Sequence, residues 1–428
     1  MWLLNTKTYE LRFFTYPPRS YAILSHCWEE DEVTFADIQD LARARKRRGW
    51  KKVENACAAA RRYKSSRERP LAWIWIDTCC IDKSSSAELS EAINAMFGWY
   101  QEAWICLAFL SDVRADEDPL TAGSSFRRSR WFTRGWTLQE LIAPHAEMVF
   151  LAKDWTAIGD RDTMVGLLED ITSVGRAVLS NTAGGRLKAI QATSVAQRMA
   201  WAATRETTRP EDRAYSLMGI FQVNMPIIYG ETGKRAFRRL QLEIIRQSPD
   251  HTIFAYGVPM YNLPPPAQIP CDDAMMMSFL PWWPKDFRFS GNLETLPMNA
   301  LARIVGVPEV QEPHYQDTNY GIRIQLPLAC VDPLRGLYCA LLGVRCKSRP
   351  GDLVGLLLKR HDDTDVYRRL DYSIIFLPGD ASRRRIVGAD GDDASSQTAL
   401  ESDAHQFRWQ TRAIYVLVQD NVHSITGL

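Results

Sequence analysis

The segment from Leu71 to Asp82, LAWIWIDTCCID, constrains the fold most, because every residue before Asp77 is apolar. An uninterrupted apolar run rich in Ile and Trp is expected of a central parallel strand that is covered on both faces. Covering both faces requires helices on each side of the sheet. The chain must therefore supply helical segments before and after this strand.

Strand and helix patterns alternate along the first 160 residues. Buried strands are predicted at 20–28, 72–77, 104–111 and 147–153. A helical region is predicted at 34–64, and Ser85 and Glu88 have the spacing of a capping box ahead of an apolar helical stripe. The alternation predicts a flavodoxin-like, doubly wound parallel sheet with helices on both faces in residues 1–160.

Three further regions are predicted after this α/β core. Residues 161–255 have helical patterns and form a helical extension, residues 256–270 form a proline-rich linker, and residues 271–428 form a separate β-rich domain. Short strand segments are expected in that domain at 302–306, 321–328, 336–345, 353–359, 373–377 and 413–419. A polar loop is expected at 389–403.

Composition excludes several classes of protein. A net charge of +1 over 428 residues argues against nucleic acid as a general partner. Nine cysteines without a CxxC pair indicate a reducing compartment, and we expect a cytoplasmic protein. No stretch approaches the roughly 18 consecutive apolar residues of a membrane-spanning helix. The basic residues within 43–64 predict either a solvated helix face or weak contact with an anionic surface.

The stretch from Ser129 to Pro144, SRWFTRGWTLQELIAP, is the leading candidate for the working centre. If Trp136 begins a helix, Glu140 lies one turn further on the same face. A carboxylate next to an indole is partly desolvated, which raises its proton affinity and suits it to meet developing positive charge. The alternative is a core helix in which Glu140 pairs with Arg134 or Arg130.

Other polar groups follow the predicted strands. Ser25 and His26 end the first strand, and Asp77 and Asp82 follow the second, at the sheet edge where open α/β sheets bind ligands. Cys27 is adjacent to His26 but on the opposite strand face, which argues against a cysteine nucleophile. The vicinal pair Cys79 and Cys80 lacks zinc-chelating spacing, so we expect no metal site.

The segment 198–221, RMAWAATRETTRPEDRAYSLMGIF, contains arginines that alternate with acidic residues. Arg205, Arg209 and Arg213 are expected to form a network of ion pairs that clamps helices together.

Four blocks in this order resemble the fungal heterokaryon incompatibility domain, called the HET domain. They are YAILSHCW (21–28), WIWIDTCCIDK (73–83), RGWTLQELIAP (134–144) and the 198–221 segment. The sequence departs from the family pattern at Glu29, where glycine is frequent, and at Lys83, where glutamine is frequent. The resemblance implies a protein that triggers cell death when genetically unlike cells fuse. Self-association or a second incompatibility protein is the expected activator.

HET domains are in turn similar to TIR domains, whose helix motif W-C-x-x-E-L resembles WTLQEL at 136–141 with Thr137 in place of cysteine. The similarity implies an NAD glycohydrolase that needs no cofactor, with NAD as its substrate and Glu140 as its catalytic carboxylate. The substrate-binding residues are then expected to be Ser25, His26, Trp28, Asp77, Asp82, Arg134 and Trp136. The alternative is a non-catalytic adaptor that kills by assembling partners.

Overall fold

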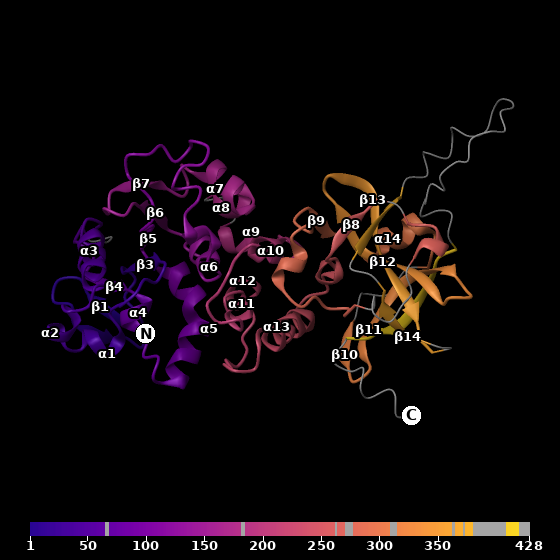
Figure 1. Cartoon of the computed structure of the whole chain (residues 1–428), viewed down its shortest axis with the longest axis horizontal. Coiled ribbons are helices and arrows are strands. Elements are labelled where there is room, and N and C mark those ends of the chain that lie inside the picture. Colours follow the sequence, from indigo (N-terminus) through magenta and orange to yellow (C-terminus); the bar gives the residue numbers. More distant parts are fainter. Residues whose placement is uncertain are drawn as a thin grey trace. The chain divides into compact units, whose positions relative to one another are not determined.

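The structure is a computed structural model, in which two compact units are distinguished (Figure 1). The first unit comprises residues 1–192 and 204–240, and the second comprises residues 193–203 and 241–428. The described residues are 1–64, 68–180, 185–261, 263–269, 277–308, 315–361, 364–370, 373–379 and 408–418. The expected polar loop at 389–403 lies outside them.

The first unit is built on a sheet with the strand order β2-β1-β4-β3-β5-β6-β7. In chain order these strands are β1 (Trp2–Asn5), β2 (Leu11–Phe13), β3 (Ala22–His26), β4 (Trp73–Trp75), β5 (Ile105–Phe109), β6 (Glu147–Leu151) and β7 (Ala157–Asp160). The inner strands β4, β3, β5 and β6 pair in parallel. The prediction of parallel pairing among the four apolar segments is therefore confirmed.

The outer strands correct the prediction of a wholly parallel sheet. β1 pairs antiparallel with both β2 and β4, and β7 pairs antiparallel with β6. The physical reason is the connection length, because the few residues that join β1 to β2 and β6 to β7 allow a hairpin but not a crossover. The sheet is mixed, with a parallel centre and antiparallel edges.

Helices cover both faces of this sheet. Those of the first unit are α1 (Phe35–Ile38), α2 (Leu41–Ala44), α3 (Trp50–Ala60), α4 (Asp77–Cys80), α5 (Ser86–Glu102), η1 (Arg130–Thr133), α6 (Thr137–Ile142), α7 (Val165–Thr172), α8 (Arg176–Leu179), α9 (Arg186–Gln191), α11 (Asp212–Tyr215) and α12 (Met218–Phe221), and α13 (Gly233–Gln247) begins in it. α3 contacts β4, and Figure 1 shows it across the sheet from α5 and α6. Trp75 of β4 is fully buried against Trp99 and Tyr100 of α5, at ring distances of 5.6 and 5.8 Å. No helix in the described residues is long and apolar enough to cross a membrane.

The predicted helical region 34–64 is divided into three helices rather than one. Gly49 precedes α3 at a close approach, because a Cβ atom there would lie 2.9 Å from Cα of Glu32. Several basic side chains of this region are paired: Arg43 and Arg47 lie 2.6 and 3.1 Å from Asp37. Lys52 is buried, with its Nζ 2.5 Å from Glu32. The basic face is therefore partly neutralised by acidic neighbours.

The packing of α12 on α5 gives a stability prediction. A Cβ atom at Gly219 would lie 2.2 Å from Cβ of Phe97, whereas a Cβ atom at the adjacent Gly98 meets nothing within 4 Å. We expect Gly219→Ala to lower the free energy of unfolding by about 1–3 kcal/mol, the usual cost of overpacking. Gly98→Ala, within α5, should raise it by about 0.5–1 kcal/mol. Urea unfolding of both variants checks this, and an equal effect of the two would contradict it.

The second unit contains a β-rich sheet, as predicted for the C-terminal part of the chain. Its described strands are β8 (Val258–Met260), β9 (Leu293–Thr295), β10 (Gln316–Thr318), β11 (Gly321–Asp332), β12 (Leu337–Cys346), β13 (Arg349–Arg360), β14 (Val366–Arg369), β15 (Ser373–Pro378) and β16 (Gln410–Val416). Successive pairings join β11, β12, β13, β14 and β16 and return to β11. These pairings close a ring, so the long strands leave few free edges.

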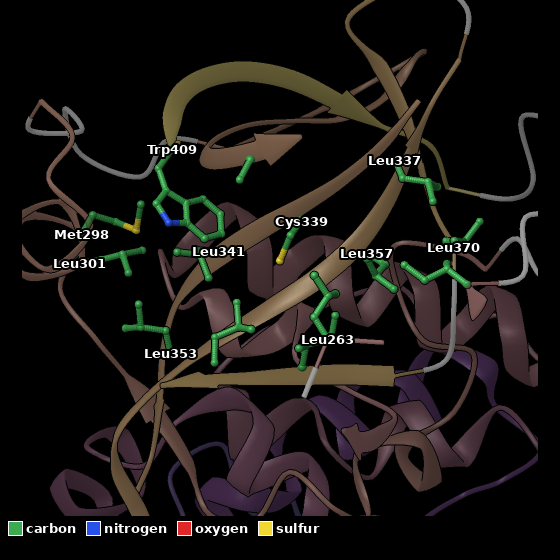
Figure 2. Close-up of a cluster of buried hydrophobic side chains, with 14 residues drawn as sticks. Leu263, Met298, Leu301, Leu337, Cys339, Leu341, Leu353, Leu357, Leu370 and Trp409 are labelled. Carbon is green, nitrogen blue, oxygen red and sulfur yellow. The ribbon is translucent and has the colours of Figure 1, made fainter. Parts of the chain in front are cut away.

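An apolar cluster holds the second unit together. Alternate residues of β12 (Leu337, Cys339 and Leu341) are buried in it, as the two-residue period of a strand requires. Figure 2 shows these side chains in one cluster with Leu353, Trp409 and two residues of α14 (Met298–Val305), which are Met298 and Leu301. That helix corrects the strand expected at 302–306, since Pro297 precedes it and the left-handed Gly306 ends it.

The boundary between the units differs from the predicted linker at 256–270. β8 lies within that range and pairs in parallel with β15, so part of the proline-rich segment belongs to the second sheet. The second unit also includes α10 (Val195–Ala202), whose amide at Val195 donates to Asp250 over 2.7 Å. The remaining helix-like turns of this unit are η2 (His251–Phe254), η3 (Pro266–Gln268) and η5 (Pro284–Phe287).

Candidate functional site

The loop before α6 is fixed by hydrogen bonds from a distant segment. The Gly135 amide donates to the carbonyl of Glu206 over 2.8 Å, and the Glu206 amide donates to the carbonyl of Thr133 over 2.7 Å. A Cβ atom at Gly135 would lie 2.4 Å from Cγ2 of Thr207, so any larger residue would require the Thr207 side chain to move. The buried Arg205 guanidinium donates to the carbonyl of Arg134 over 2.9 Å. The start of α6 is therefore held in one position.

Glu140 of α6 is buried, with 7% of its surface exposed. Its Oε2 accepts a hydrogen bond of 2.5 Å from the Ser25 hydroxyl, and Ser25 Oγ in turn accepts one of 2.8 Å from the indole of Trp131. Ser25 lies in β3 and Trp131 in η1, so the sheet and the preceding turn together orient the carboxyl group.

Burial dominates the proton affinity of Glu140. Removal from water raises its pKa from 4.5 to about 8, and the nearby Asp77 charge adds to that effect. The hydrogen bonds from Ser25 and Tyr100 and the charge of Arg134 oppose the rise in pKa. Glu140 therefore holds a proton through most of the neutral range, and a cation beside it would favour release of that proton.

A second group of polar residues surrounds Asp77, at the start of α4. His26 Nε2 lies 2.9 Å from Oδ1 of Asp77, and the indole of Trp28 donates to Oδ2 over 2.7 Å. Burial acts to raise the pKa of Asp77, but hydrogen bonding and the charges of His26 and Lys83 hold it at about 2. Lys83 Nζ also lies 3.4 Å from the ring centre of Trp28. Asp77 therefore fixes the Trp28 indole in place.

A third group comes from residues 204–229. The indole of Trp136 donates to Oδ2 of Asp212 over 3.3 Å, and the Tyr229 hydroxyl donates to Oδ1 over 3.0 Å. The guanidinium of Arg209 lies 4.1 Å from the ring centre of Tyr229. Arg134 donates to the hydroxyl of Thr208 over 3.3 Å. This segment thus brings both cationic and acidic side chains to α6.

These three groups enclose one cavity of about 250 Å³ at the carboxyl ends of β3 and β4. Three apolar residues of α5 (Leu89, Ile93 and Met96) contribute to its lining. The other lining residues are His26, Trp28, Asp77, Ile81, Lys83, Arg134, Trp136, Thr137, Glu140, Thr208, Arg209, Asp212 and Tyr229. Apolar and aromatic side chains thus share the lining with several charged and polar ones, and a concave site of this mixed kind can bind a small polar molecule.

Two of the residues expected to bind substrate do not line this cavity. Ser25 is fully buried and bonded to Glu140, so it supports the carboxyl group instead. The carboxylate of Asp82 accepts from the amide and hydroxyl of Ser84 over 2.9 and 2.6 Å, in the turn before α5. The two residues lie outside the cavity lining for the same reason: a position after a strand gives proximity to the sheet edge but does not set the direction of the side chain.

The sequence interpretation missed the contribution of residues 204–229 to the cavity. It expected the arginines of the 198–221 segment to form ion pairs between helices, but Arg209 contacts Tyr229 and lines the cavity. The signal present in the sequence was the density of Arg and acidic residues in one segment, which is typical of functional sites as well as of structural networks.

Cys27 follows His26 in the sequence but is a poor candidate nucleophile. Its thiol is buried, and burial raises its pKa to about 12 despite the charges of Arg130 and Arg134. A thiol with so high a pKa stays protonated, and only the thiolate is strongly nucleophilic.

Comparison with known proteins places these features in a family. Residues 21–123 match the profile of the heterokaryon incompatibility protein family (HET), and residues 235–337 match a domain of unknown function, DUF8212. The vegetative incompatibility protein HET-E-1 of Podospora anserina is 43% identical over 234 residues. That match covers 53% of this chain but only 16% of the relative. No solved structure matches.

The HET match includes β3, β4 and β5, and with them three residues of the cavity: His26 at the end of β3, Trp28 just after it and Asp77 after β4. The DUF8212 match begins within α13 and extends into the strands of the second unit. The family profile and the identity to HET-E-1 agree with the HET-like blocks of the sequence. This chain is therefore a protein with a fungal heterokaryon incompatibility (HET) domain.

Proposed function

We propose that this protein is a heterokaryon incompatibility protein, a cytoplasmic cell-death effector in non-self recognition, and that its HET domain hydrolyses NAD through Glu140. The observation that carries the catalytic part is a buried carboxyl group with a raised pKa that lines a cavity with both apolar and charged side chains. The identity to HET-E-1 supports the biological role. NAD is the substrate in this proposal, and no cofactor is required.

The strand order supports a TIR-like, flavodoxin-like interpretation of the first unit. In chain order the parallel strands are β3, β4, β5 and β6, and in the sheet they lie as β4-β3-β5-β6. Flavodoxin-like sheets begin with the same second-first-third-fourth order, and they bind ligands at the carboxyl ends of strands near the point where the order reverses. The cavity lies at the carboxyl ends of β3 and β4, which is the edge of the sheet at which such folds bind ligands.

The chemistry of the nicotinamide–ribose bond suits a single buried carboxyl group. Cleavage passes through an oxocarbenium-like state, and a fixed anion close to the ribose lowers its energy. The nicotinamide ring of NAD is positively charged, so its binding beside Glu140 would favour loss of the proton that burial retains. Nicotinamide then leaves as a neutral ring, for which no strong general acid is needed.

The lining of the cavity suits the parts of a dinucleotide. A volume of about 250 Å³ is slightly below the roughly 300–1,000 Å³ of typical ligand sites, so it suits the nicotinamide riboside half. Trp28, fixed by Asp77, offers an aromatic surface for stacking. Arg134 and Arg209 lie at the same cavity and provide charge for the pyrophosphate.

Purified full-length protein should convert NAD to nicotinamide and ADP-ribose, and cells that express it should lose NAD before they lose viability. Chromatography of the reaction and of cell extracts measures both. Toxicity without any loss of NAD would instead favour a non-catalytic adaptor that acts by assembling partners. Self-association or a second incompatibility protein is the proposed activator, so the assay should span a range of protein concentrations.

A further inference from the structure

Asp212 is a second buried carboxyl group of the same cavity. Asp212 is the first residue of α11, and 9% of its surface is exposed to solvent. Its two oxygens accept one hydrogen bond each, from the neutral indole of Trp136 and the neutral hydroxyl of Tyr229. Among the described residues Asp212 forms no salt bridge, although the Arg209 guanidinium lies over the Tyr229 ring. A carboxylate has about four acceptor positions, so two remain for a water molecule in the cavity.

Trp136 links Asp212 to Glu140. The indole nitrogen contacts Asp212, and the same residue precedes Glu140 by one helical turn at the start of α6. The two carboxyl groups therefore reach the cavity from different segments, α6 and α11, and the Trp136 side chain lines the same cavity. Pairs of carboxyl groups that reach a scissile glycosidic bond from two sides commonly divide the roles of charge stabilisation and water activation.

We propose that Asp212 is the general base that activates the attacking water, an inference that rests on the NAD hydrolysis proposed above. The water oxygen forms a bond to C1′ of the ribose while the bond from C1′ to the nicotinamide nitrogen breaks. The electron pair of that bond neutralises the ring nitrogen, and the proton of the water passes to Asp212. Neither Trp136 nor Tyr229 competes as a base, since both donate their hydrogens to Asp212.

The proton affinity of Asp212 fits this role. Burial raises its pKa above the ordinary value, although Tyr229, Trp136 and Arg209 oppose the rise. A general base works best when its pKa approaches the working pH, so a carboxylate with a raised pKa accepts the proton of water better than an exposed one. Glu140 differs because its carboxyl group already accepts the hydrogen bond that the Ser25 hydroxyl donates, and in the proposed reaction it faces the positive charge that develops on the ribose.

The test compares two nucleophiles on full-length protein. Water must lose a proton when it attacks the ribose, whereas the nitrogen of 3-acetylpyridine carries none and needs no base. We expect Asp212→Asn to slow hydrolysis about 100-fold, within the usual range for a general base, and to change exchange with 3-acetylpyridine only a few-fold. Glu140→Gln should slow both reactions together. The matched control is Asp118→Asn, at an exposed residue whose carboxylate accepts only from the Leu120 amide among the described contacts.

Each outcome has one meaning. Hydrolysis by Asp212→Asn at the parental rate, or equal loss of hydrolysis and exchange in a folded variant, overturns the role of Asp212 and leaves NAD cleavage by Glu140 standing. Absence of both reactions in the parental protein overturns the proposed function itself. If Asp212→Asn does not fold, Asp212→Ala is assayed with added formate, and the inference is overturned unless formate restores hydrolysis.

Discussion

Glu140→Gln should reduce the rate of NAD cleavage by about 100- to 1,000-fold, the usual effect of removing one group that stabilises charge in the transition state. Glutamine has nearly the same volume, and its amide oxygen is able to accept the hydrogen bond that Ser25 donates to Glu140. The fold and the cavity should therefore persist while the negative charge is lost. Initial rates of nicotinamide release, with unfolding curves for both proteins, measure this result.

The control for this variant is Glu147→Gln, which removes a carboxyl group that is exposed at the start of β6. It should cleave NAD at the parental rate. A folded Glu140→Gln protein that still depletes NAD at the parental rate contradicts the assignment of Glu140. If the parental protein and Glu140→Gln are equally toxic and neither depletes NAD, the result favours the adaptor alternative. In that alternative the α/β unit serves only as an interaction surface.

The free energy of unfolding of the protein should depend on pH through Glu140. The folded state raises the pKa of Glu140 from 4.5 to about 8, so between these values the folded protein holds a proton that the unfolded chain has released. Its contribution to stability is fully present below pH 4.5 and is lost as pH rises through about 8. At about 1.4 kcal/mol per pH unit, the total loss is on the order of 5 kcal/mol.

Glutamine at this position does not titrate, so Glu140→Gln should gain stability relative to the parental protein as pH increases. Urea unfolding at intervals from pH 4.5 to 9 measures the difference in free energy of unfolding between the two. The difference should change by a few kcal/mol across this window in favour of the variant. A difference that stays constant would mean that Glu140 is already ionised in the folded protein at low pH.

The sequence by itself determined the parallel centre of the first sheet and the helix α5. The apolar run before Asp77 predicted a strand covered on both faces, and in β4 Ile74 and Trp75 are buried while Trp73 is half-buried. Ser85 caps α5 by accepting the Glu88 amide, which is one half of the predicted capping box, while the Glu88 carboxylate accepts from the Asp82 amide instead of the Ser85 amide. Both features depend on residues that are near one another in the chain, where periodicity and capping act. The same local spacing placed Trp136 and Glu140 in one cavity.

Only the tertiary structure decided which distant groups meet. Ser25 supports Glu140 across 115 residues of sequence, and Asp212 contacts Trp136 across 76. Neither contact follows from periodicity, because the path of the intervening chain sets it. The edge strands β1 and β7 and the closure of the second sheet through β14 and β16 depend in the same way on pairing between separate segments. Sequence pattern determines which face of an element is buried, whereas the packing of whole elements determines which side chains reach a shared cavity.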